Sequence, residues 1–496
     1  MEPRNLGGVK GSDELVEGRR FRVTRVTERA AAGGAPAFHQ IEARAEPALR
    51  VDLALPLNWN GRLCVQGNGG YAGEAVDTPF RDLPRNLALA LGYAVAGSNT
   101  GHDADVEPLA TFASDPDKLV DYAHRAVHQT TLLAKALLHR IYGEGPRYSY
   151  FQGCSTGGRQ ALIAAQRYPD DFDGIIAGAP VLDFTGSQLW SIRTAQFLAD
   201  TGIGAAEMAV VAAAINRFHG ADEDRPFILD DPIHSGFDIR RDVPVCDGDA
   251  PTPGTLTRKQ AEAIAAVYAP ADIGGRMFPG FPIGAEAIGL TQPGFPPTSG
   301  WEGWVYRSDE GFFAGAPDGV RAAFGETFVT QMLGFKGGWR DFDFSPRALG
   351  EIERFEALLN ATDADLGPFA ARGGKLMLYH GLADPALNAA RTIAYFEEAR
   401  HIMGKDKVDA FARFYPMPGM FHCFGGYGPD QFDMLTPLVA WVEAGTAPGT
   451  LVATKGPSDA PEMSRPLYPY PKVAKYSGSG DPRHAGSYEA ADTLAS

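Results

Sequence analysis

The periodicity of hydrophobic and polar positions changes along the 496 residues of this chain. Over 20–55 apolar and polar residues alternate, and this period of two predicts antiparallel strands with one face towards solvent. From 60 to 180, and again from 373 to 446, short apolar runs alternate with helical stretches such as the amphipathic segment 120–142. This alternation predicts a mainly parallel sheet covered by helices.

The middle of the chain breaks that alternation. Between 181 and 370 helical segments such as 205–218 are joined by loops rich in proline and glycine. Because this stretch interrupts the alternation, we interpret it as a lid domain. The predicted organisation is a first part of an α/β core at 1–180, the lid at 181–370 and a second part of the core at 371–496. The last part carries a tail without clear periodicity, which we expect to pack along the surface or to fray.

One turn in the first part of the core has the pattern of a catalytic nucleophile. A strand-like run at 148–152 leads into Gly-Cys-Ser-Thr-Gly-Gly at 153–158, and a helix-like run follows at 159–167. In such a nucleophile elbow, small neighbours let the chain turn sharply and leave the hydroxyl of Ser155 exposed. The N–H of Thr156 would lie at a helix start, where it favours a developing oxyanion. The alternative is a serine in an ordinary glycine-rich turn.

A nucleophile elbow needs an acid and a base later in the chain, in the order Ser, Asp, His. A buried strand predicted at 375–379 is followed by a loop that carries Asp384, at the strand end where functional groups gather in open α/β sheets. A second strand-like run at 411–415 leads into a loop with His422. Each residue alone could be an ordinary loop residue, but in this order they predict a triad with Ser155.

Two cysteines flank these candidates. Cys154 directly precedes the serine and Cys423 directly follows the histidine. If the triad forms, the two thiols lie side by side, and a disulfide would tie the serine turn to the histidine loop. The alternative is a pair of buried free thiols, because cysteine is common in protein cores.

The oxyanion needs a second N–H donor besides that of Thr156, from a loop after an early strand. Gly67-Asn68-Gly69-Gly70 is the candidate, because glycines let the main chain approach a ligand closely. We favour Gly70 over Gly69. The alternative is a plain turn.

On these residues, the chain resembles the tannase and feruloyl esterase family, which also includes a hydrolase of terephthalate mono-esters. The similarity includes 66–73, the segment 150–180 around the serine, Asp384 and the His422-Cys423 pair. The resemblance implies an α/β-hydrolase fold with a large lid domain inserted between the nucleophile strand and the acid strand. It also implies the Ser–Asp–His triad, a Cys154–Cys423 disulfide and hydrolysis of aromatic-acid esters (feruloyl, galloyl or terephthalate mono-ester type) through an acyl-enzyme.

The lid is rich in aromatic side chains, whose flat apolar faces suit an aromatic acyl group. For each ring the alternative is a place in the lid's own core. The candidates for substrate binding are Trp190, Trp301, Trp304, Phe313 and Trp339. Two arginines, Arg193 and Arg391, could pair with a substrate carboxylate, although structural ion pairs are the simpler interpretation.

Many members of the resembled family carry a calcium loop in the lid. Here the corresponding stretch lacks the cysteine and the Asp-Gly steps, so we interpret its acidic residues as solvated loop carboxylates. They are Asp222, Asp224, Asp230 and Asp231. The histidines show no metal-binding spacing, and the chain shows no phosphate loop and no dinucleotide fingerprint. We therefore expect no cofactor. The alternative is a calcium ion in the lid, because these aspartate carboxylates are suitable oxygen ligands even though the family motif is degraded.

Charge and composition narrow the partners. A formal net charge of −16 and a pI near 5.2 argue against a nucleic-acid or anionic-membrane surface. No apolar run reaches the length of about 18 residues that suggests a membrane span. Residues 1–5 lack the apolar core of a signal peptide, whereas the predicted disulfide favours the periplasm or the extracellular space. The expected partner is a small aromatic ester, and the oligomeric state stays open.

Two other functions compete with the aromatic esterase. The first is a lactonase, or a hydrolase of non-aromatic esters, on the same triad. The second is a non-catalytic α/β-hydrolase-fold binding protein. We disfavour the second because silent relatives generally lack a triad residue, and none is missing here.

Overall fold

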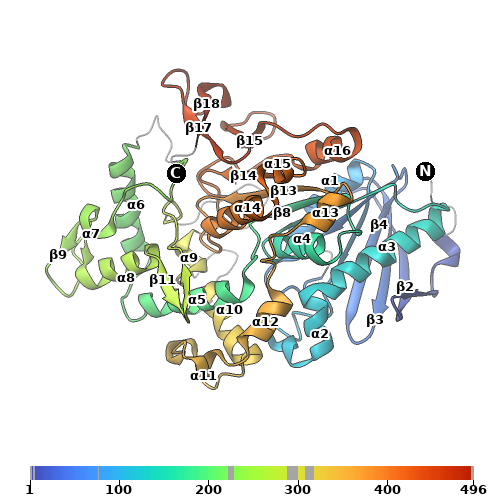
Figure 1. The fold of residues 1–496 in the computed structure, drawn as a ribbon, viewed down its shortest axis with the longest axis horizontal. Coiled ribbons are helices and arrows are strands. Elements are labelled where there is room, and N and C mark those ends of the chain that lie inside the picture. Colours follow the sequence, from blue (N-terminus) through green and yellow to red (C-terminus); the bar gives the residue numbers. More distant parts are fainter. Residues whose placement is uncertain are drawn as a thin grey trace.

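In the described residues, ten strands form one mixed sheet through the centre of the molecule (Figure 1). In this computed structural model, residues 3, 6–75, 78–221, 228–286, 300–307 and 318–492 are described. The strands lie in the order β1 (Asp13–Val16), β2 (Arg19–Arg29), β3 (Phe38–Ala45), β4 (Leu49–Pro56), β6 (Ala94–Ser98), β5 (Arg62–Gln66), β7 (Tyr148–Cys154), β8 (Gly174–Gly178), β13 (Lys375–Gly381) and β14 (Ala412–Met417).

The two halves of this sheet differ in strand direction. β1 to β4 pair antiparallel, and β6 pairs antiparallel with β4. From β6 to β14 every neighbouring pair is parallel. The alternating segment and the mainly parallel core expected from the sequence are thus both present, and the carboxyl ends of β7, β8, β13 and β14 meet at one edge.

Helices cover both faces of the sheet. On one face, side chains of α3 (Ala126–Tyr142), α4 (Thr156–Arg167) and α14 (Ala389–Met403) share an apolar core with strand residues such as Val65 and Leu378. On the other face, α1 (Pro79–Ala90) and α16 (Leu435–Ala444) share a core with the alternate strand residues. Successive strand side chains point to opposite faces, so parallel strands such as β6 and β8 are buried on both faces and apolar. The antiparallel β2 instead keeps an exposed, polar face. None of the described helices is both long and apolar enough to cross a membrane.

The long helix predicted at 120–142 is interrupted near its start. The chain passes from α2 (Pro116–Val120) through a π-helical turn, η3 (Asp121–Arg125), into α3. Asp121 is buried there and accepts hydrogen bonds from Arg19 at 2.8 Å and Arg125 at 2.6 Å. The sequence pattern detected the helix but not its π turn, because such a turn leaves the apolar periodicity almost unchanged. The remaining short helices of the core are η1 (Leu6–Gly8), η2 (Thr111–Ser114), α13 (Gly367–Ala371) and α15 (Lys405–Asp409).

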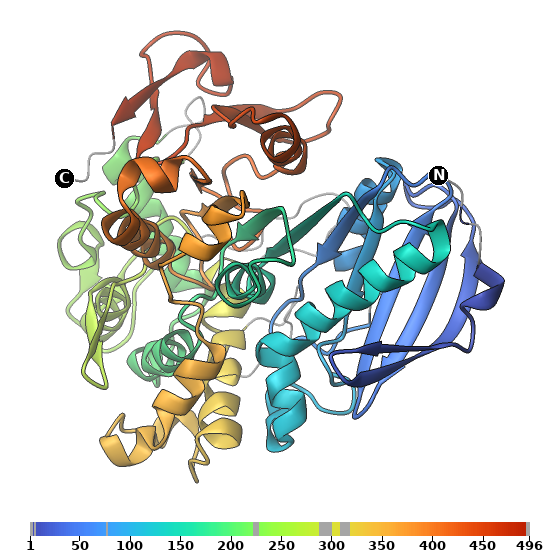
Figure 2. The same cartoon turned by 45° about the vertical axis from the view of Figure 1, so that its right-hand side comes forward.

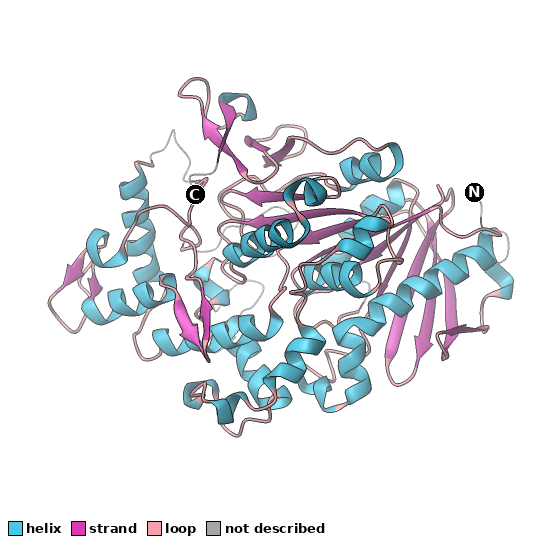
Figure 3. Cartoon of the chain, viewed as in Figure 1, coloured by secondary structure: helices cyan, strands magenta, loops and turns pink. Residues whose placement is uncertain are grey.

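Between β8 and β13 the described residues add no strand to the central sheet. This part is mostly helical and lies to one side of the sheet (Figures 2 and 3). Its side chains form a second apolar core, which also includes Ala383 and Phe421 from loops of the sheet domain. Its elements are α5 (Phe184–Leu198), α6 (Ala205–His219), α7 (Ile239–Asp242), β9 (Val245–Cys246), β10 (Leu256–Thr257), α8 (Arg258–Tyr268), β11 (Ala271–Ile273), β12 (Arg276–Phe278), α9 (Trp301–Trp304), α10 (Val320–Thr327), η4 (Phe328–Met332), η5 (Trp339–Asp341), α11 (Pro346–Leu349) and α12 (Ile352–Leu359).

The tail is more regular than its sequence suggested. It forms β16 (Met463–Leu467), which pairs with β15 (Leu451–Lys455), and the hairpin of β17 (Lys472–Tyr476) and β18 (Tyr488–Asp492), with η6 (Ala485–Ser487) between them. Figure 1 shows β15 near α16 and the hairpin of β17 and β18 at the top of the molecule. Short strands with proline and glycine between them carry too few alternating positions to be recognised from the sequence alone.

His128 joins three segments of the core, and it makes stability depend on pH. Its Nδ1 lies 2.7 Å from Asp171 and its Nε2 lies 3.1 Å from Glu17. Burial alone would lower the pKa of His128, but the hydrogen bonds and charges of Asp171 and Glu17 raise it above its ordinary value of about 6.5. The charged imidazole therefore contributes stability that is fully present below the unfolded-state pKa, and that is lost as pH rises through the higher folded-state pKa.

We predict that His128→Gln removes the part of the stability that His128 contributes at low pH, so that the free energy of unfolding depends less on pH than in wild type. The loss in free energy of unfolding relative to wild type should be larger near pH 6 than near pH 8.5, because only the charged imidazole is stabilised by both carboxylates. Urea unfolding at both pH values measures it. The exposed His139→Gln serves as the control and should follow wild type. A loss that is equal at both pH values would contradict the prediction.

Candidate active site

The predicted serine turn joins β7 to α4, with Ser155 at its apex. Ser155 has φ 65° and ψ −121°, a conformation that costs a non-glycine residue about 1–3 kcal/mol and persists only where its surroundings enforce it. The glycines make the turn possible: a Cβ on Gly153 would lie 2.7 Å from Gly157, and a Cβ on Gly158 would lie 2.2 Å from the carbonyl oxygen of Gly178. This is the geometry of a nucleophile elbow.

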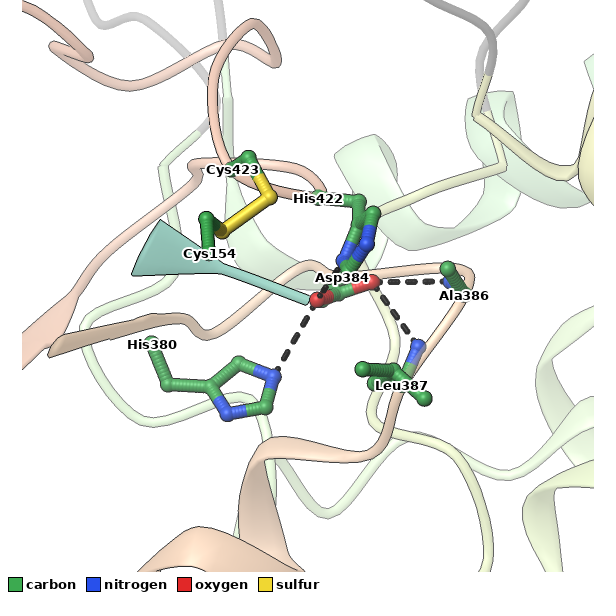
Figure 4. Close-up of a disulfide and its surroundings, with 7 residues drawn as sticks. All are labelled: Cys154, His380, Asp384, Ala386, Leu387, His422 and Cys423. Carbon is green, nitrogen blue, oxygen red and sulfur yellow. Dashed lines mark hydrogen bonds and ion pairs between the residues drawn. A yellow bond between two sulfur atoms is a disulfide. The ribbon is translucent and has the colours of Figure 1, made fainter. Parts of the chain in front are cut away.

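Asp384 lies just beyond β13 and is buried (Figure 4). Its Oδ1 accepts hydrogen bonds from the backbone N–H groups of Ala386 at 2.8 Å and Leu387 at 2.9 Å. Its Oδ2 lies 2.7 Å from Nδ1 of His422 and 3.1 Å from Nε2 of His380. The predicted acid and base are therefore in direct contact.

Four donors keep this carboxyl group ionised. Burial alone would raise the pKa of Asp384, but the charge of His422 and the hydrogen bonds from His380 and His422 hold it well below its usual range. An ionised carboxylate can only accept hydrogen bonds. The imidazole of His422 must therefore donate its Nδ1–H to Asp384, which leaves Nε2 as the atom able to accept a proton.

The disulfide expected from the flanking cysteines is present. Cys154 and Cys423 are bonded, with their Cα atoms 5.9 Å apart, so the free-thiol alternative is wrong. Figure 4 shows the bond linking the end of β7, next to Ser155, to the loop that carries His422. The other two cysteines, Cys64 and Cys246, are free.

The loops of the acid and the base are also joined through their backbones. The N–H of Leu382 donates to the carbonyl of Met417 at 2.9 Å, and the N–H of Ala383 donates to that of Met420 at 3.1 Å. Gly381 permits this contact, because a Cβ there would lie 2.3 Å from the carbonyl oxygen of Met420. The Asp384–His422 pair thus stands on two loops that cannot separate without breaking backbone hydrogen bonds.

The glycine loop predicted to supply an oxyanion donor packs directly on the serine turn. A Cβ on Gly67 would lie 2.5 Å from Cα of Gly157, so only glycine allows the approach. The carbonyl of Gly70 accepts hydrogen bonds from the hydroxyl of Thr156 and, at 3.3 Å, from that of Tyr122. The N–H of Gly69 points instead towards Glu74, at 3.4 Å. The structure thus brings the predicted loop beside the elbow.

A pocket lies near the serine turn and the acid, although none of Ser155, Asp384 and His422 is among its lining residues. Pro180 and Leu182 form one wall, next to Val181, whose N–H donates to the carbonyl of Ser155 at 3.3 Å. Ala386 and Leu387, the backbone donors to Asp384, form another. The remaining lining residues come mainly from the lid and from α14: Asp183, Ser187, Trp190, Phe278, Pro279, Phe281, Arg321, Asn388 and Arg391.

Arg321 is the unusual member of this lining. Its side chain is buried, and within the described residues its Nε and Nη1 have no hydrogen-bond partner. The guanidinium lies over the ring of Phe281, 4.4 Å from its centroid. Burial lowers the pKa of Arg321 to about 9, against the opposing effect of Asp384. The pocket therefore contains a buried cation whose Nε and Nη1 have no hydrogen-bond partner among the described residues.

The predicted aromatic residues of the lid fall into different groups. Trp190 lines the pocket, and Trp304 meets His422 edge to face with ring centroids 5.1 Å apart. Trp301 packs on Tyr268 in the lid core, where Trp339 is also buried. Phe313 lies outside the described residues.

The charged residues singled out from the sequence mostly have protein partners. Arg391 pairs with Asp183 at 2.7 Å, as the structural interpretation expected. Arg193 lies over the ring of Phe344, 4.0 Å from its centroid. Asp230 accepts from Arg465 at 2.8 Å, and Asp231 lies 3.0 Å from His234. Asp222 and Asp224 lie outside the described residues. Within the described part, no three His, Cys, Asp or Glu side chains are grouped as a metal site would require.

Sequence reasoning missed three residues at the site. His380 was treated only as part of the loop after the acid strand, although its spacing of four from Asp384 was visible. Tyr122 and Arg321 carried no local signal, because their importance depends on burial beside distant segments.

Sheet and site together have the architecture of an α/β hydrolase. The chain belongs to the tannase and feruloyl esterase family, whose model matches residues 35–491. An uncharacterised esterase of Xanthomonas campestris is 32% identical over 92% of this chain and 85% of its own length. The mono(2-hydroxyethyl) terephthalate hydrolase of Piscinibacter sakaiensis is 31% identical over 87% of this chain and 80% of its own length. The crystal structure of an esterase from Aspergillus oryzae, 26% identical, matches with a TM-score of 0.79 over 95% of this chain and 97% of that chain. The predicted family and fold are thus confirmed.

We predict that removing the disulfide weakens both stability and catalysis. The double variant Cys154→Ser/Cys423→Ser should lose about 2–4 kcal/mol of stability, since the bond closes a very long loop. Its ester-hydrolysis rate should also fall, because the serine turn and the histidine loop lose their covalent link. Thermal unfolding and initial rates measure the two effects.

The control for this prediction is Cys246→Ser, which removes a free thiol. Treatment with a reductant should act on wild type in the direction of the double variant, and should leave the double variant unchanged. Unaltered stability and rate in the double variant would show that the link is dispensable.

Proposed function

We propose that this protein is a serine carboxylic ester hydrolase that cleaves esters of aromatic acids through an acyl-enzyme intermediate. The observation that supports it best is the contact of 2.7 Å between His422 and Asp384. The loop that carries His422 is also disulfide-bonded, through Cys423, to the residue that precedes Ser155. Family membership points in the same direction.

In the proposed mechanism, His422 Nε2 takes the proton of Ser155 as Oγ attacks the ester carbonyl. Asp384 fixes the imidazole tautomer and stabilises the imidazolium without taking its proton. His422 then gives the proton to the departing alcohol. Water, activated by the same imidazole, hydrolyses the acyl-enzyme and releases the acid.

The oxyanion would be stabilised by the backbone N–H groups of Thr156 and Gly70. The helix start at Thr156 adds a favourable dipole. The N–H of Gly69 is directed to Glu74, which supports Gly70 as the second donor. The Thr156 and Tyr122 hydroxyls hold the Gly70 carbonyl and so orient this part of the loop.

The pocket beside the site suits an aromatic acyl group with an anionic substituent. Trp190 and Phe281, which line it, stack on each other with centroids 6.1 Å apart and make this part of the lining aromatic. Arg321 is a buried cation that a substrate carboxylate could neutralise. Terephthalate, named in the Piscinibacter relative, has such a second carboxylate on its ring. Among the aromatic acyl groups considered, these contacts favour the terephthalate mono-ester type over the uncharged feruloyl and galloyl types.

The alternatives are a lactonase or a non-aromatic esterase on the same triad, and a binding protein without turnover. The aromatic lining of the pocket and the buried Arg321 suit an aromatic, anionic acyl group, and so count against a lactonase or a non-aromatic esterase. The intact set of triad residues counts against a binding protein without turnover. The mechanism requires no cofactor.

We place the protein in an oxidising compartment, the periplasm or the extracellular space. The Cys154–Cys423 disulfide is the reason, since such bonds are rare where thiols are kept reduced.

We predict covalent labelling of Ser155 by a serine-directed phosphonate. Ser155→Ala should not be labelled, and its kcat should fall by roughly five orders of magnitude or more, because the nucleophile is lost. Mass spectrometry of the labelled peptide and rates with an aromatic mono-ester measure this. Lack of an adduct on folded wild type would refute the serine mechanism.

We predict that Arg321 discriminates substrates by charge. With Arg321→Gln, KM for a terephthalate mono-ester should rise about 10- to 100-fold, the effect of losing a charge-assisted hydrogen bond. KM for the neutral dimethyl terephthalate should change by less than about twofold, since the ring contacts remain. Steady-state kinetics with both esters test it, with Arg193→Gln as the control. Equal changes for both esters would contradict the role.

A further inference from the structure

The carboxylate of Asp384 receives more hydrogen bonds than the triad requires. Two backbone N–H groups bind Oδ1, and Oδ2 is shared between His422 at 2.7 Å and His380 at 3.1 Å (Figure 4). His380 approaches from the opposite side of the carboxylate to His422 in this view. The second imidazole has no place in the mechanism proposed above.

His380 is itself held in one orientation. It lies at the end of β13, on the same strand face as Leu376 and Leu378, which pack against α14. Its Nδ1 lies 2.8 Å from the hydroxyl of Thr392 on α14. His380, Thr392 and Asp384 are all buried. The unit is thus fixed between the acid strand and the helix behind it.

The protons in this unit are dictated by the carboxylate. Ionised Asp384 offers only acceptors, so Nε2 of His380 carries the hydrogen of that contact. Nδ1 of the same ring lies against the hydroxyl of Thr392, which can donate to it or accept from it. Every polar atom of the His380 ring therefore has a partner.

Another buried histidine shows that this arrangement is not a general consequence of burial. His102 is as deeply buried as His380, yet within the described residues no carboxylate or other side chain forms a hydrogen bond with its ring nitrogens. It stacks on Phe112 instead, with centroids 3.9 Å apart. His102 fills space, whereas His380 is directed at the catalytic carboxylate.

We propose that His380, oriented by Thr392, is a positioning residue for Asp384: its Nε2–H occupies one acceptor site of Oδ2 and directs the other towards His422. This inference rests on the triad proposed above. His380 touches neither substrate nor reacting atoms, and it acts only through the carboxylate.

Two physical effects follow from this contact. A second N–H donor on Oδ2 spreads the negative charge of the carboxylate and lowers its affinity for the proton of the His422 imidazolium. It also prevents the carboxylate from rotating away, since a buried acceptor without a donor is costly. The other charged group that acts on Asp384 is Arg321, which stays in place in every variant described below.

The test compares three variants with wild type. His380→Leu removes both nitrogens at similar size. His380→Gln keeps an N–H donor near the position of Nε2. Thr392→Val removes only the hydroxyl that orients the ring. Thr131→Val is the matched control, because Thr131 is also a buried helix threonine, but its hydroxyl bonds to the carbonyl of Val127, in α3.

The expected results combine rate and pH dependence. His380→Leu should lower kcat about 10- to 100-fold, as loss of an outer-shell partner does, with KM within about twofold. Without the competing donor, more negative charge faces His422, so its protonated form is favoured and the acidic limb of kcat/KM should move to higher pH. His380→Gln should restore most of both effects. Thr392→Val should shift the limb in the same direction by less, and Thr131→Val should match wild type.

The outcomes separate this inference from the proposed function. Active sites are titrated first with the phosphonate: no adduct on wild type defeats the proposed function itself. If wild type is labelled but the His380 variants keep its kcat and pH profile, the positioning role alone is wrong. If His380→Leu lowers kcat without moving the pH profile, and His380→Gln does not restore kcat, His380 only fills space and the positioning role is wrong. Should His380→Leu fail to fold, the pH profiles of His380→Gln and Thr392→Val still decide.

Discussion

The bond between Cys154 and Cys423 is the constraint on which the arrangement of the site depends. It joins the strained serine turn after β7 to the loop after β14, two segments separated by 269 positions and by the whole lid. Backbone hydrogen bonds between the acid loop and the histidine loop complete the frame. The frame around Asp384 and His422 therefore consists of strand ends, a disulfide and main-chain contacts.

Two buried charged side chains lie at the site, and only one of them has its hydrogen bonds satisfied by the described part of the protein. Asp384 receives four donors and remains ionised. Arg321, across the pocket, has two nitrogens without partners in the described residues. A protein that only needed stability would gain from replacing such a cation with an apolar side chain. The imbalance is better explained by a ligand that brings its own negative charge, and this is why the proposed substrate carries a second carboxylate.

Some side chains of the lid contact the site, whereas others pack within the lid's own core. Trp304 meets the ring of His422, and Arg321 reaches into the pocket, while Trp301 and Trp339 are buried within the lid. The apolar core of the lid also takes in Ala383 and Phe421, which neighbour the acid and the base. Packing in the lid and the geometry of the candidate site are therefore linked, and substitutions in the lid core should be judged by their effect on both.

The sequence alone determined what depends on local order: the glycine-flanked serine, the strand periods, the succession of Ser, Asp and His, and the flanking cysteines. These features could be predicted because each depends on near neighbours, or on an order that the fold must respect. Only the tertiary structure decided which lid aromatics face the site, that the tail forms strands, and that His380 and Arg321 belong to the site. These features depend on contacts between segments that are far apart in the sequence. Such contacts bury a side chain, leave a charged group without its full set of hydrogen bonds or let two histidines share one carboxylate oxygen, and no short stretch of sequence specifies them.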